Sequence, residues 1–536
     1  MTLITKYFTL LMFLCGFFEA KGQSLHPRRE MRAVWISTVG NIDWPSRKGL
    51  STENQKREYI ALLEQLQKNN FNAVITQVRP AADAIYESSY EPWSEVLQGK
   101  QGLSPKPYYD PLAWMLVESK KRNLEFHAWV NPFRAVSSLN FSNIHPNHIS
   151  KSKPEWFFKY GDRLYFNPGI PEVRQYIITI IMEIILKYDI DGLHFDDYFY
   201  PYQITGERIN DDDTFDKFGE NFRNIEDWRR NNIDTFIQAV SDSIKKHKPR
   251  LKFGISPAGG WRNQSKDPRG SATRVGQPSY DHLYADTRKW LEKGWIDYLA
   301  PQLYWTTQSK YASYQTLIEW WNKNTFGRHI YGGQGAFKVG STDDEFGWRS
   351  PEEFLKQIML NRKHTNVKGS IFFSAKPLLK NPLNVLDSLQ EKYYKYPAFV
   401  PQMPWKDALP PLPPKNLKAT YANKRIALKW QAPENAKDGE KPTYYVVFRF
   451  DNELKINTGD VSAIVTIQRQ TDFYDFAVEE KRNYIYVVKS FDRLHNESRQ
   501  YARVKIATIR KLTMPSPIKD DKQRPENEQN GILEED

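Results

Sequence analysis

The chain has 536 residues, 40% of them hydrophobic and 14% aromatic, with 76 Lys and Arg against 64 Asp and Glu and a formal net charge of +12. This length exceeds one ordinary domain and accommodates a large barrel with a smaller module behind it. The basic residues are dispersed and form no dense tract, which argues against nucleic acid as a partner and leaves a bias toward anionic cell-wall polymers.

Residues 1–22 have the features of a secretory signal peptide. Lys6 precedes an apolar run over residues 7–18, and small residues lead to a cleavage position after Gly22. The run is too short to span a bilayer as a mature helix, and no later segment approaches that length. The single cysteine, Cys15, raises the alternative of a lipid anchor, but the bulky residues at 12–14 favour ordinary cleavage. We therefore expect an exported protein, periplasmic or at the cell surface, without a transmembrane segment or a thiol in the mature chain.

Over residues 29–396, short apolar runs alternate with amphipathic segments of helical period. Helix starts are marked, for example, by a capping box at Thr52 and by Asp110 before a proline. The runs expected to form strands are 32–37, 73–78, 125–130, 192–196, 252–256, 298–304, 330–335 and 369–374. Strands that are each followed by a helix predict a (β/α)₈ TIM barrel. An open doubly wound sheet is the alternative, but no Gly-rich phosphate loop opens a helix.

The pattern changes after the barrel. Residues 397–414 are rich in proline and predict a semi-rigid linker. Residues 415–511 alternate as antiparallel strands without helices, which predicts an immunoglobulin-like sandwich; Trp430 and the strand around Tyr486 resemble fibronectin type III modules. Residues 512–536 are charged and contain several prolines, and we expect them to be disordered.

The strongest functional signal is the pair Asp196 and Asp197 at the end of the fourth predicted strand. Function in a TIM barrel sits at the carboxyl ends of the strands. Adjacent carboxylates repel each other, which raises one pKa toward the range that a general acid needs. In the structural alternative, one Asp caps the following loop and the other pairs with Arg79 or Arg134.

Other side chains at or beyond strand ends are candidate substrate contacts. His194 is more plausible as a packed, hydrogen-bonded barrel histidine than as a metal ligand, and no HxH or HExxH spacing is present. We therefore predict no metal and no cofactor, with a metal-dependent polysaccharide deacetylase as a rival reading. The candidate substrate contacts are Asp43, Trp44, Gln77, Arg79, Asp83, Asn131, His194, Tyr198, Gln302, Tyr304, Trp305 and Gln334.

Four separated segments, at residues 30–45, 77–83, 128–132 and 192–198, resemble the glycosyl-hydrolase-like 10 family in the same order. The likeness covers roughly residues 29–392 and implies a barrel glycosidase. A division-site member of that family is described as cleaving peptidoglycan glycan strands stripped of their peptides. A more distant likeness is to chitinase-type barrels, which share Asp191-Gly192, Asp196 and Gln302-x-Tyr304 but carry a glutamate acid where this chain has Tyr198.

These observations lead to a mechanistic hypothesis. Asp197 protonates the leaving oxygen, and Asp196 stabilises the oxocarbenium-like centre or orients the substrate's own N-acetyl group, which Tyr304 steadies. Arg79 holds the lactyl carboxylate of a muramic sugar. Asp43 or Asp83 could instead supply the second carboxylate. The rival class is a glycan-binding protein without turnover, because the chitinase acid is missing at Tyr198.

Overall fold

The structure is a computed structural model that describes residues 25–136, 144–342 and 345–509. The expected signal peptide over residues 1–22, with Cys15, and the expected tail over residues 512–536 lie outside the described residues. Within the described ranges, no helix combines the length and apolar character needed to cross a membrane.

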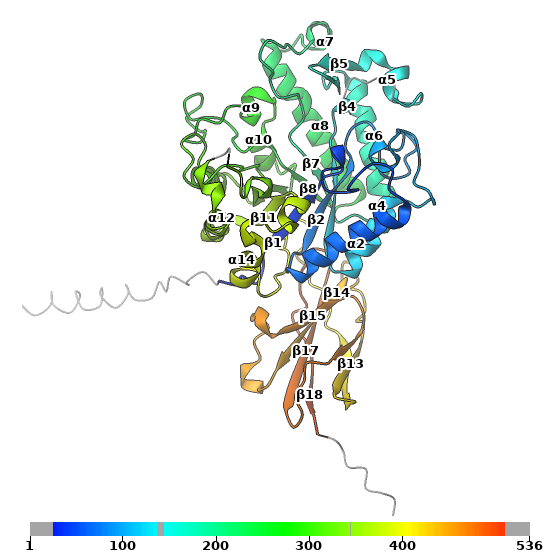
Figure 1. The fold of residues 1–536 in the computed structure, drawn as a ribbon, viewed down its shortest axis with the longest axis vertical. Helices are drawn as coiled ribbons and strands as arrows, with labels where there is room; N and C mark the ends of the chain where they lie inside the picture. Colours follow the sequence, from blue (N-terminus) through cyan, green and yellow to red (C-terminus); the bar gives the residue numbers. More distant parts are fainter. Residues whose placement is uncertain (1–24, 137–143, 343–344, 510–536) are drawn as a thin grey trace, which may run out of the picture.

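The predicted barrel is confirmed (Figure 1). In the described residues its parallel strands close in the order β1-β11-β10-β9-β8-β7-β3-β2, and each expected run overlaps one of them. The sixth strand is shorter than the predicted 298–304; the chain continues beyond it only through isolated bridges from Gln302 to Ala258 and Gly333. The strands are β1 (Met31–Ile36), β2 (Ala73–Arg79), β3 (Glu125–Val130), β7 (Gly192–Phe195), β8 (Lys252–Ile255), β9 (Tyr298–Leu299), β10 (His329–Gly335) and β11 (Val367–Phe373).

A helix follows each barrel strand and covers the outside of the barrel. Outward residues such as Val34 and Phe195 pack against these helices in the main core, whereas inward residues such as Trp35 form a second core inside the barrel. Asp110 caps its helix as predicted, but the cap of the first is Ser51, one residue before Thr52. The helices are α2 (Thr52–Lys68), α4 (Pro111–Lys121), α6 (Pro171–Lys187), α8 (Ile225–His247), α10 (Thr287–Glu292), α11 (Tyr314–Lys323), α12 (Glu352–Lys363) and α14 (Val385–Lys392).

The barrel mouth, at the carboxyl ends of the strands, carries shorter elements. The long connection after β3 forms a three-stranded antiparallel sheet, and Figure 1 shows it at the end of the molecule far from the C-terminal sheets. This sheet and the other short elements form a wall beside the mouth. They are α3 (Glu95–Gln98), β4 (Arg134–Val136), α5 (Ile149–Ser152), β5 (Phe157–Tyr160), β6 (Arg163–Phe166), α7 (Asp212–Phe218), α9 (Ser279–His282) and α13 (Ala375–Leu379).

The first part of the predicted linker is packed into the barrel base. Val400 and Met403 are buried in the same core as the inward barrel residues, and the indole N–H of Trp405 donates to Asp297 at 2.8 Å. The predicted semi-rigid linker over residues 397–414 is therefore packed against the barrel at its start. The physical reason is that the amino-terminal end of the barrel needs an apolar plug, and this segment supplies it.

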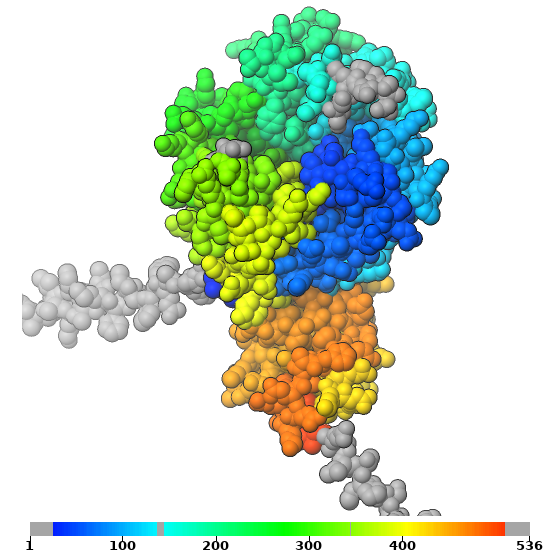
Figure 2. All heavy atoms as spheres, in the orientation of Figure 1, coloured from blue at the N-terminus to red at the C-terminus, as the bar shows by residue number. Residues whose placement is uncertain are grey.

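Residues 415–507 form two antiparallel sheets, which we call the C-terminal β domain. Figure 2 shows it, in orange, as a narrower body below the barrel. Arg493 ion-pairs with Asp189 at 2.6 Å, and Arg469 donates to the backbone of Lys120 at 3.1 Å, so charged contacts join the domain to the barrel base. Its strands are β12 (Lys415–Ala422), β13 (Arg425–Gln431), β14 (Tyr444–Phe450), β15 (Ile464–Gln468), β16 (Asp472–Asp475), β17 (Asn483–Phe491) and β18 (Ala502–Ala507).

Candidate active site

Asp196 follows the last residue of β7 and points into the barrel mouth. One carboxylate oxygen, Oδ2, accepts hydrogen bonds from the indole N–H of Trp129 at 3.2 Å and from the side-chain amide of Asn131 at 3.0 Å. Both donors belong to β3 or its end, the neighbouring strand of the barrel. The other oxygen, Oδ1, is buried and has no hydrogen-bond partner among the described residues. The carboxyl group is therefore held on one side and left free on the other.

The pKa of Asp196 is raised to about 7. Burial is the main cause and the charge of Asp197 adds to it, while Arg134, whose guanidinium lies 3.9 Å from Oδ2, opposes the increase. Because Asp196 adjoins Asp197, the raised pKa indicates that the pair can hold one proton near neutral pH, which is the property of an acid–base pair.

Asp197 has different surroundings. Its Oδ2 accepts a hydrogen bond from the hydroxyl of Tyr202, and the Gln302 side chain also lowers its pKa. Burial nevertheless raises the pKa of Asp197 above its ordinary value. Asp197 and Asp196 are each only 3% exposed, so their charges repel each other through protein rather than water.

Two tyrosines stand beside the acid pair. Tyr198 lies under the Arg134 guanidinium, 4.8 Å from the ring centroid, and the charge of Asp197 is the main cause that raises its pKa to an abnormally high value. Burial raises the pKa of Tyr304, and the charge of Asp197 adds to that effect. The structure therefore brings together six of the predicted residues, which are Asn131, Asp196, Asp197, Tyr198, Gln302 and Tyr304.

Arg79 does not face the mouth. Its guanidinium makes a bidentate ion pair with Glu91, at 2.6 and 2.7 Å, and also donates to the backbone oxygens of Asn131 and Pro132. The Arg79 side chain is fully buried. The predicted contact with a lactyl carboxylate is therefore wrong, because the fork of donors is already occupied inside the protein.

Asp43, Trp44 and Gln77 serve the first loop rather than a ligand. Asp43 accepts from the backbone of Ser37 and of Lys376, which ties the end of β1 to the end of β11. Trp44 is fully buried and donates to the Gln55 carbonyl at 2.8 Å. The Gln77 oxygen accepts from the backbone of residues 38 and 39, although its buried amide nitrogen has no hydrogen-bond partner in the described structure. The expected substrate role of these residues is corrected to a supporting one.

His194 lies inside the barrel, as the structural reading predicted, and not in the substrate site. Its Nε2 accepts from the indole of Trp35 at 3.1 Å, and its Nδ1 meets the hydroxyl of Tyr298 at 3.0 Å. Burial lowers the pKa of His194 well below its ordinary value, so the ring is neutral. Gln334 is also misassigned: it points outward and donates to Gln357 on α12 at 3.0 Å.

Asp83 and Trp305 lie in loops around the mouth. Asp83 is buried and accepts from Gln101 at 3.3 Å, and burial raises its pKa to about 6. Trp305 is half-buried, and its ring packs over Gly259, where a Cβ atom would come within 2.8 Å of it. Neither side chain has a recorded hydrogen bond to the acid pair within the described residues.

Two residues of the site, Trp129 and Tyr202, were not among the predicted contacts, whereas Arg134 lies near Asp196 as the structural alternative expected. Trp129 and Arg134 contact Asp196, and Tyr202 holds Asp197. Trp129 could have been found, because it precedes Asn131 by two residues and so shares its inward face. Tyr202 lies on irregular backbone, where no periodicity shows which way a side chain points.

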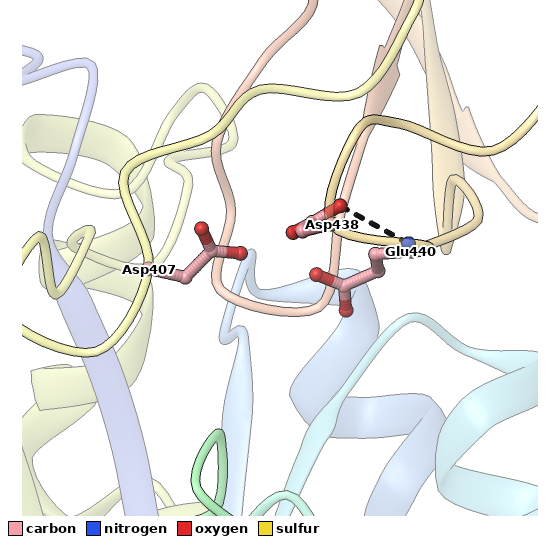
Figure 3. A group of neighbouring side chains, drawn as sticks. All are labelled: Asp407, Asp438 and Glu440. Atoms are coloured by element: carbon pink, nitrogen blue, oxygen red, sulfur yellow. Dashed lines mark hydrogen bonds between the residues drawn. The ribbon is translucent and has the colours of Figure 1, made fainter.

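A group of carboxylates with metal-ligand spacing lies elsewhere. Figure 3 shows Asp407, Asp438 and Glu440 facing one another where the packed segment after the barrel meets the C-terminal β domain. Arg250 is their internal counter-ion, at 2.8 Å from Asp438 and 3.2 Å from Glu440. Among the described residues this group of metal-type ligands is therefore at the barrel base and not at the mouth.

A closed parallel barrel whose mouth holds two buried, mutually repelling carboxylates has the acid–base groups that hydrolysis of a glycosidic bond requires. A family model described as Glycosyl hydrolase-like 10 matches residues 30–349, and the chain belongs to this family. The family resemblance predicted from the sequence is confirmed.

Two named relatives agree with this assignment. The chain is 46% identical over 491 residues to a Bacillus subtilis (strain 168) protein named glycosyl hydrolase YngK, which covers 91% of this chain and 94% of that protein. It is 40% identical over 366 residues to glycosyl hydrolase DigH of Escherichia coli (strain K12), covering 64% and 82%. The glycoside hydrolase domain of PgaB (BpsB) from Bordetella bronchiseptica aligns with 68% of this chain and 99% of that domain, at 12% identity and a TM-score of 0.44.

Proposed function

We propose that the protein is a glycoside hydrolase that cleaves an N-acetylated cell-wall glycan, with peptide-free peptidoglycan strands as its substrate. The observation that carries the proposal is the buried pair Asp196 and Asp197, whose two carboxyls have different hydrogen-bond partners. Two carboxyls in different environments divide the roles of acid and base or stabiliser, as glycosidases require.

In the proposed reaction, Asp197 donates its proton to the glycosidic oxygen as the bond to the anomeric carbon breaks. The acetamide oxygen of the substrate attacks that carbon, and Asp196 accepts the acetamide N–H and stabilises the positive charge. Water then opens the cyclic intermediate and returns a proton to Asp197. Tyr304, beside Asp197, orients the acetamide. Asp43 and Asp83 take no part, since Asp43 is tied to the backbone and Asp83 to Gln101.

The location and the C-terminal β domain belong to the proposal. The expected signal peptide supports export to the cell envelope, where peptidoglycan lies. The sheets pair as β12-β13-β16 and β15-β14-β17-β18, and Trp430 is buried between them, which supports a fibronectin type III-like sandwich. The hydroxyl of Tyr486 donates to Asp475 at 2.7 Å, across from one sheet to the other.

The test uses purified protein with peptide-free glycan strands and with chitin oligomers, read by new reducing ends and product masses. The Asp197→Asn variant is expected to lose about 10²- to 10⁴-fold in kcat, because the general acid is removed. The matched control is Asp213→Asn, which changes the exposed member of another adjacent Asp pair, on α7.

Three results would count against the proposal, the first two against the whole of it. Binding of strands without new reducing ends would identify a glycan-binding protein. Release of acetate that a chelator abolishes would identify a metal-dependent deacetylase. Cleavage of chitin alone would retain the glycosidase and reject peptidoglycan as its substrate.

Replacing Arg134 with Gln is expected to move the alkaline limb of the pH profile of kcat/KM upward by about half a pH unit or more. Arg134 lowers the pKa of both Asp196 and Asp197, so without it the pair keeps its proton to higher pH. The profile is measured from about pH 5 to about pH 9.

The control is Arg274→Gln, because Arg274 lies over the ring of Tyr311 at 5.3 Å much as Arg134 lies over Tyr198, but has no recorded contact with the acid pair in the described structure. An Arg134→Gln profile that coincides with the wild type, or an equal displacement in the control, would contradict the electrostatic account.

A further inference from the structure

Phe337 is an exposed aromatic residue at the barrel mouth. It lies in a short 3₁₀ turn, Ala336–Lys338, that directly follows the carboxyl end of β10. Its side chain is 47% exposed, whereas the preceding Ala336 is buried. An exposed phenylalanine alone is ordinary, because much of any protein surface is apolar. What requires explanation is the set of rings around it.

Three aromatic rings meet at this position. The Phe337 ring lies 5.6 Å from Tyr304 and 5.9 Å from Phe373 between centroids, at interplanar angles of 89° and 88°. Tyr304 and Phe373 lie 6.1 Å apart at only 27° to each other. Phe337 therefore stands perpendicular to two nearly parallel, half-buried rings, and the three form a corner that we call the aromatic corner.

The backbone beneath the corner is a glycine. A Cβ atom on Gly335 would lie 3.2 Å from the Phe337 ring and 3.3 Å from the Tyr304 ring, closer than ordinary van der Waals contact. The missing side chain thus lets the two rings approach each other. Gly335 at the end of β10 therefore favours close packing of these rings.

The corner adjoins both catalytic carboxyls. Tyr304 lies close enough to Asp197 for the charge of Asp197 to raise the pKa of the Tyr304 hydroxyl, in addition to the effect of burial. The Phe373 ring is 6.5 Å from that of Trp129, whose indole N–H donates to Asp196. Asp197 is thus next to a member of the corner and Asp196 is one side chain away, so a sugar ring seated there belongs to the same glycan strand as the bond that is cleaved.

We propose that the aromatic corner is a sugar-binding subsite, in which the apolar C–H face of one pyranose ring packs against Phe337. The inference rests on the proposed function, since it names the residue that holds the strand beside Asp197. A pyranose offers axial C–H groups to one face and hydroxyls to its edge, so an exposed phenyl ring next to a tyrosine hydroxyl matches both parts of it. Covering Phe337 also removes an apolar ring from water.

The test separates binding from cleavage. In the full-length Asp197→Asn protein, the affinity for an N-acetylglucosamine tetramer and for peptide-free glycan strands is measured by calorimetry. Adding Phe337→Ala is expected to raise Kd about five- to tenfold for both, since one ring-stacking contact is lost. Adding Phe337→Trp instead is expected to restore or strengthen binding. Thermal unfolding should shift only slightly, because the ring is half exposed although it packs against Tyr304 and Phe373.

Phe346→Ala is the matched control. Phe346 is 81% exposed and lies near Arg349, and no aromatic ring partner is recorded for it among the described residues. Its loss is expected to leave Kd unchanged. If Phe337→Ala binds as tightly as its parent, the subsite is rejected while the hydrolase proposal stands. If the Asp197→Asn parent binds neither glycan and the wild type cleaves neither, the proposed function itself fails.

Discussion

The Asp196→Asn variant is expected to lose glycan cleavage and to unfold at a higher temperature than the wild type above neutral pH. Asparagine can keep the hydrogen bonds, because its oxygen can accept from Trp129 and Asn131 where Oδ2 does now. Its amide group then occupies the place of Oδ1, which has no hydrogen-bond partner in the described structure. The variant thus removes a buried charge without creating a cavity, but it cannot serve as the carboxylate that stabilises the reacting centre.

The pH dependence of this stability change follows from the raised pKa. The pKa of Asp196 is about 7 in the folded protein against an ordinary value of 3.8, so the folded state binds a proton that the unfolded state has released. The wild type therefore loses stability as pH rises from about 4 through about 7. The neutral asparagine avoids this loss, so its advantage is absent near pH 4 and grows to on the order of 2 kcal/mol above pH 7.

The measurement is thermal unfolding of both proteins across that pH range, together with a strand-cleavage assay. The exposed Asp213→Asn variant controls for a general effect of removing one negative charge. A lower unfolding temperature for Asp196→Asn at pH 8, or unchanged turnover, would show that Asp196 is a structural carboxylate. The opposite result is expected of a functional carboxylate that lowers the stability of the folded protein.

The barrel and its acid pair could be predicted from the sequence because both depend on simple periodicity. Each strand is a short apolar run, and Asp196 and Asp197 follow one of them directly. Alternation from Tyr298 correctly sends Gln302 and Tyr304 to the inner side, since Tyr298 and Ala300 lie in the inner core. Where a strand is regular, the two-residue alternation of side chains is enough to predict which face each residue occupies.

Two of the misassigned residues, Arg79 and Gln334, lie where a strand is irregular. In β2 the register with β3 shifts between Gln77 and Arg79, so Gln77 faces inward while Arg79 pairs with the outward position of Val130. In β10 the register shifts between Ile330 and Gly332, and Gln334 aligns with the outward Phe372. A one-residue register shift moves side chains from one face of a strand to the other, and the residue types give no signal of such a shift.

Arg79→Met is expected to destabilise the protein by about 3–5 kcal/mol, the largest stability loss that we predict for a single substitution. The change leaves Glu91 buried without its partner, and Glu91 is held by no other ion pair among the described residues. The double variant Arg79→Met/Glu91→Leu is expected to recover most of the loss, because no unpaired charge remains. Chemical denaturation measures all three proteins, with Arg208→Met as control, since Arg208 pairs with Asp212 on the exposed surface and should cost less than about 1 kcal/mol.

The same variants decide between the two roles considered for Arg79. A residue that held a lactyl carboxylate would lower the affinity for anionic peptide-free strands and leave that for neutral chitin oligomers unchanged. If Arg79 is instead a buried ion-pair partner, it supports the backbone at Asn131, which in turn donates to Asp196. Loss of the Arg79 side chain should then reduce kcat on both glycans to a similar degree. A stable Arg79→Met protein that discriminates between the two glycans would therefore support the sequence interpretation. An unstable Arg79→Met protein that loses activity on both glycans alike would show that Arg79 lies behind the site and supports the carboxyl that faces the substrate.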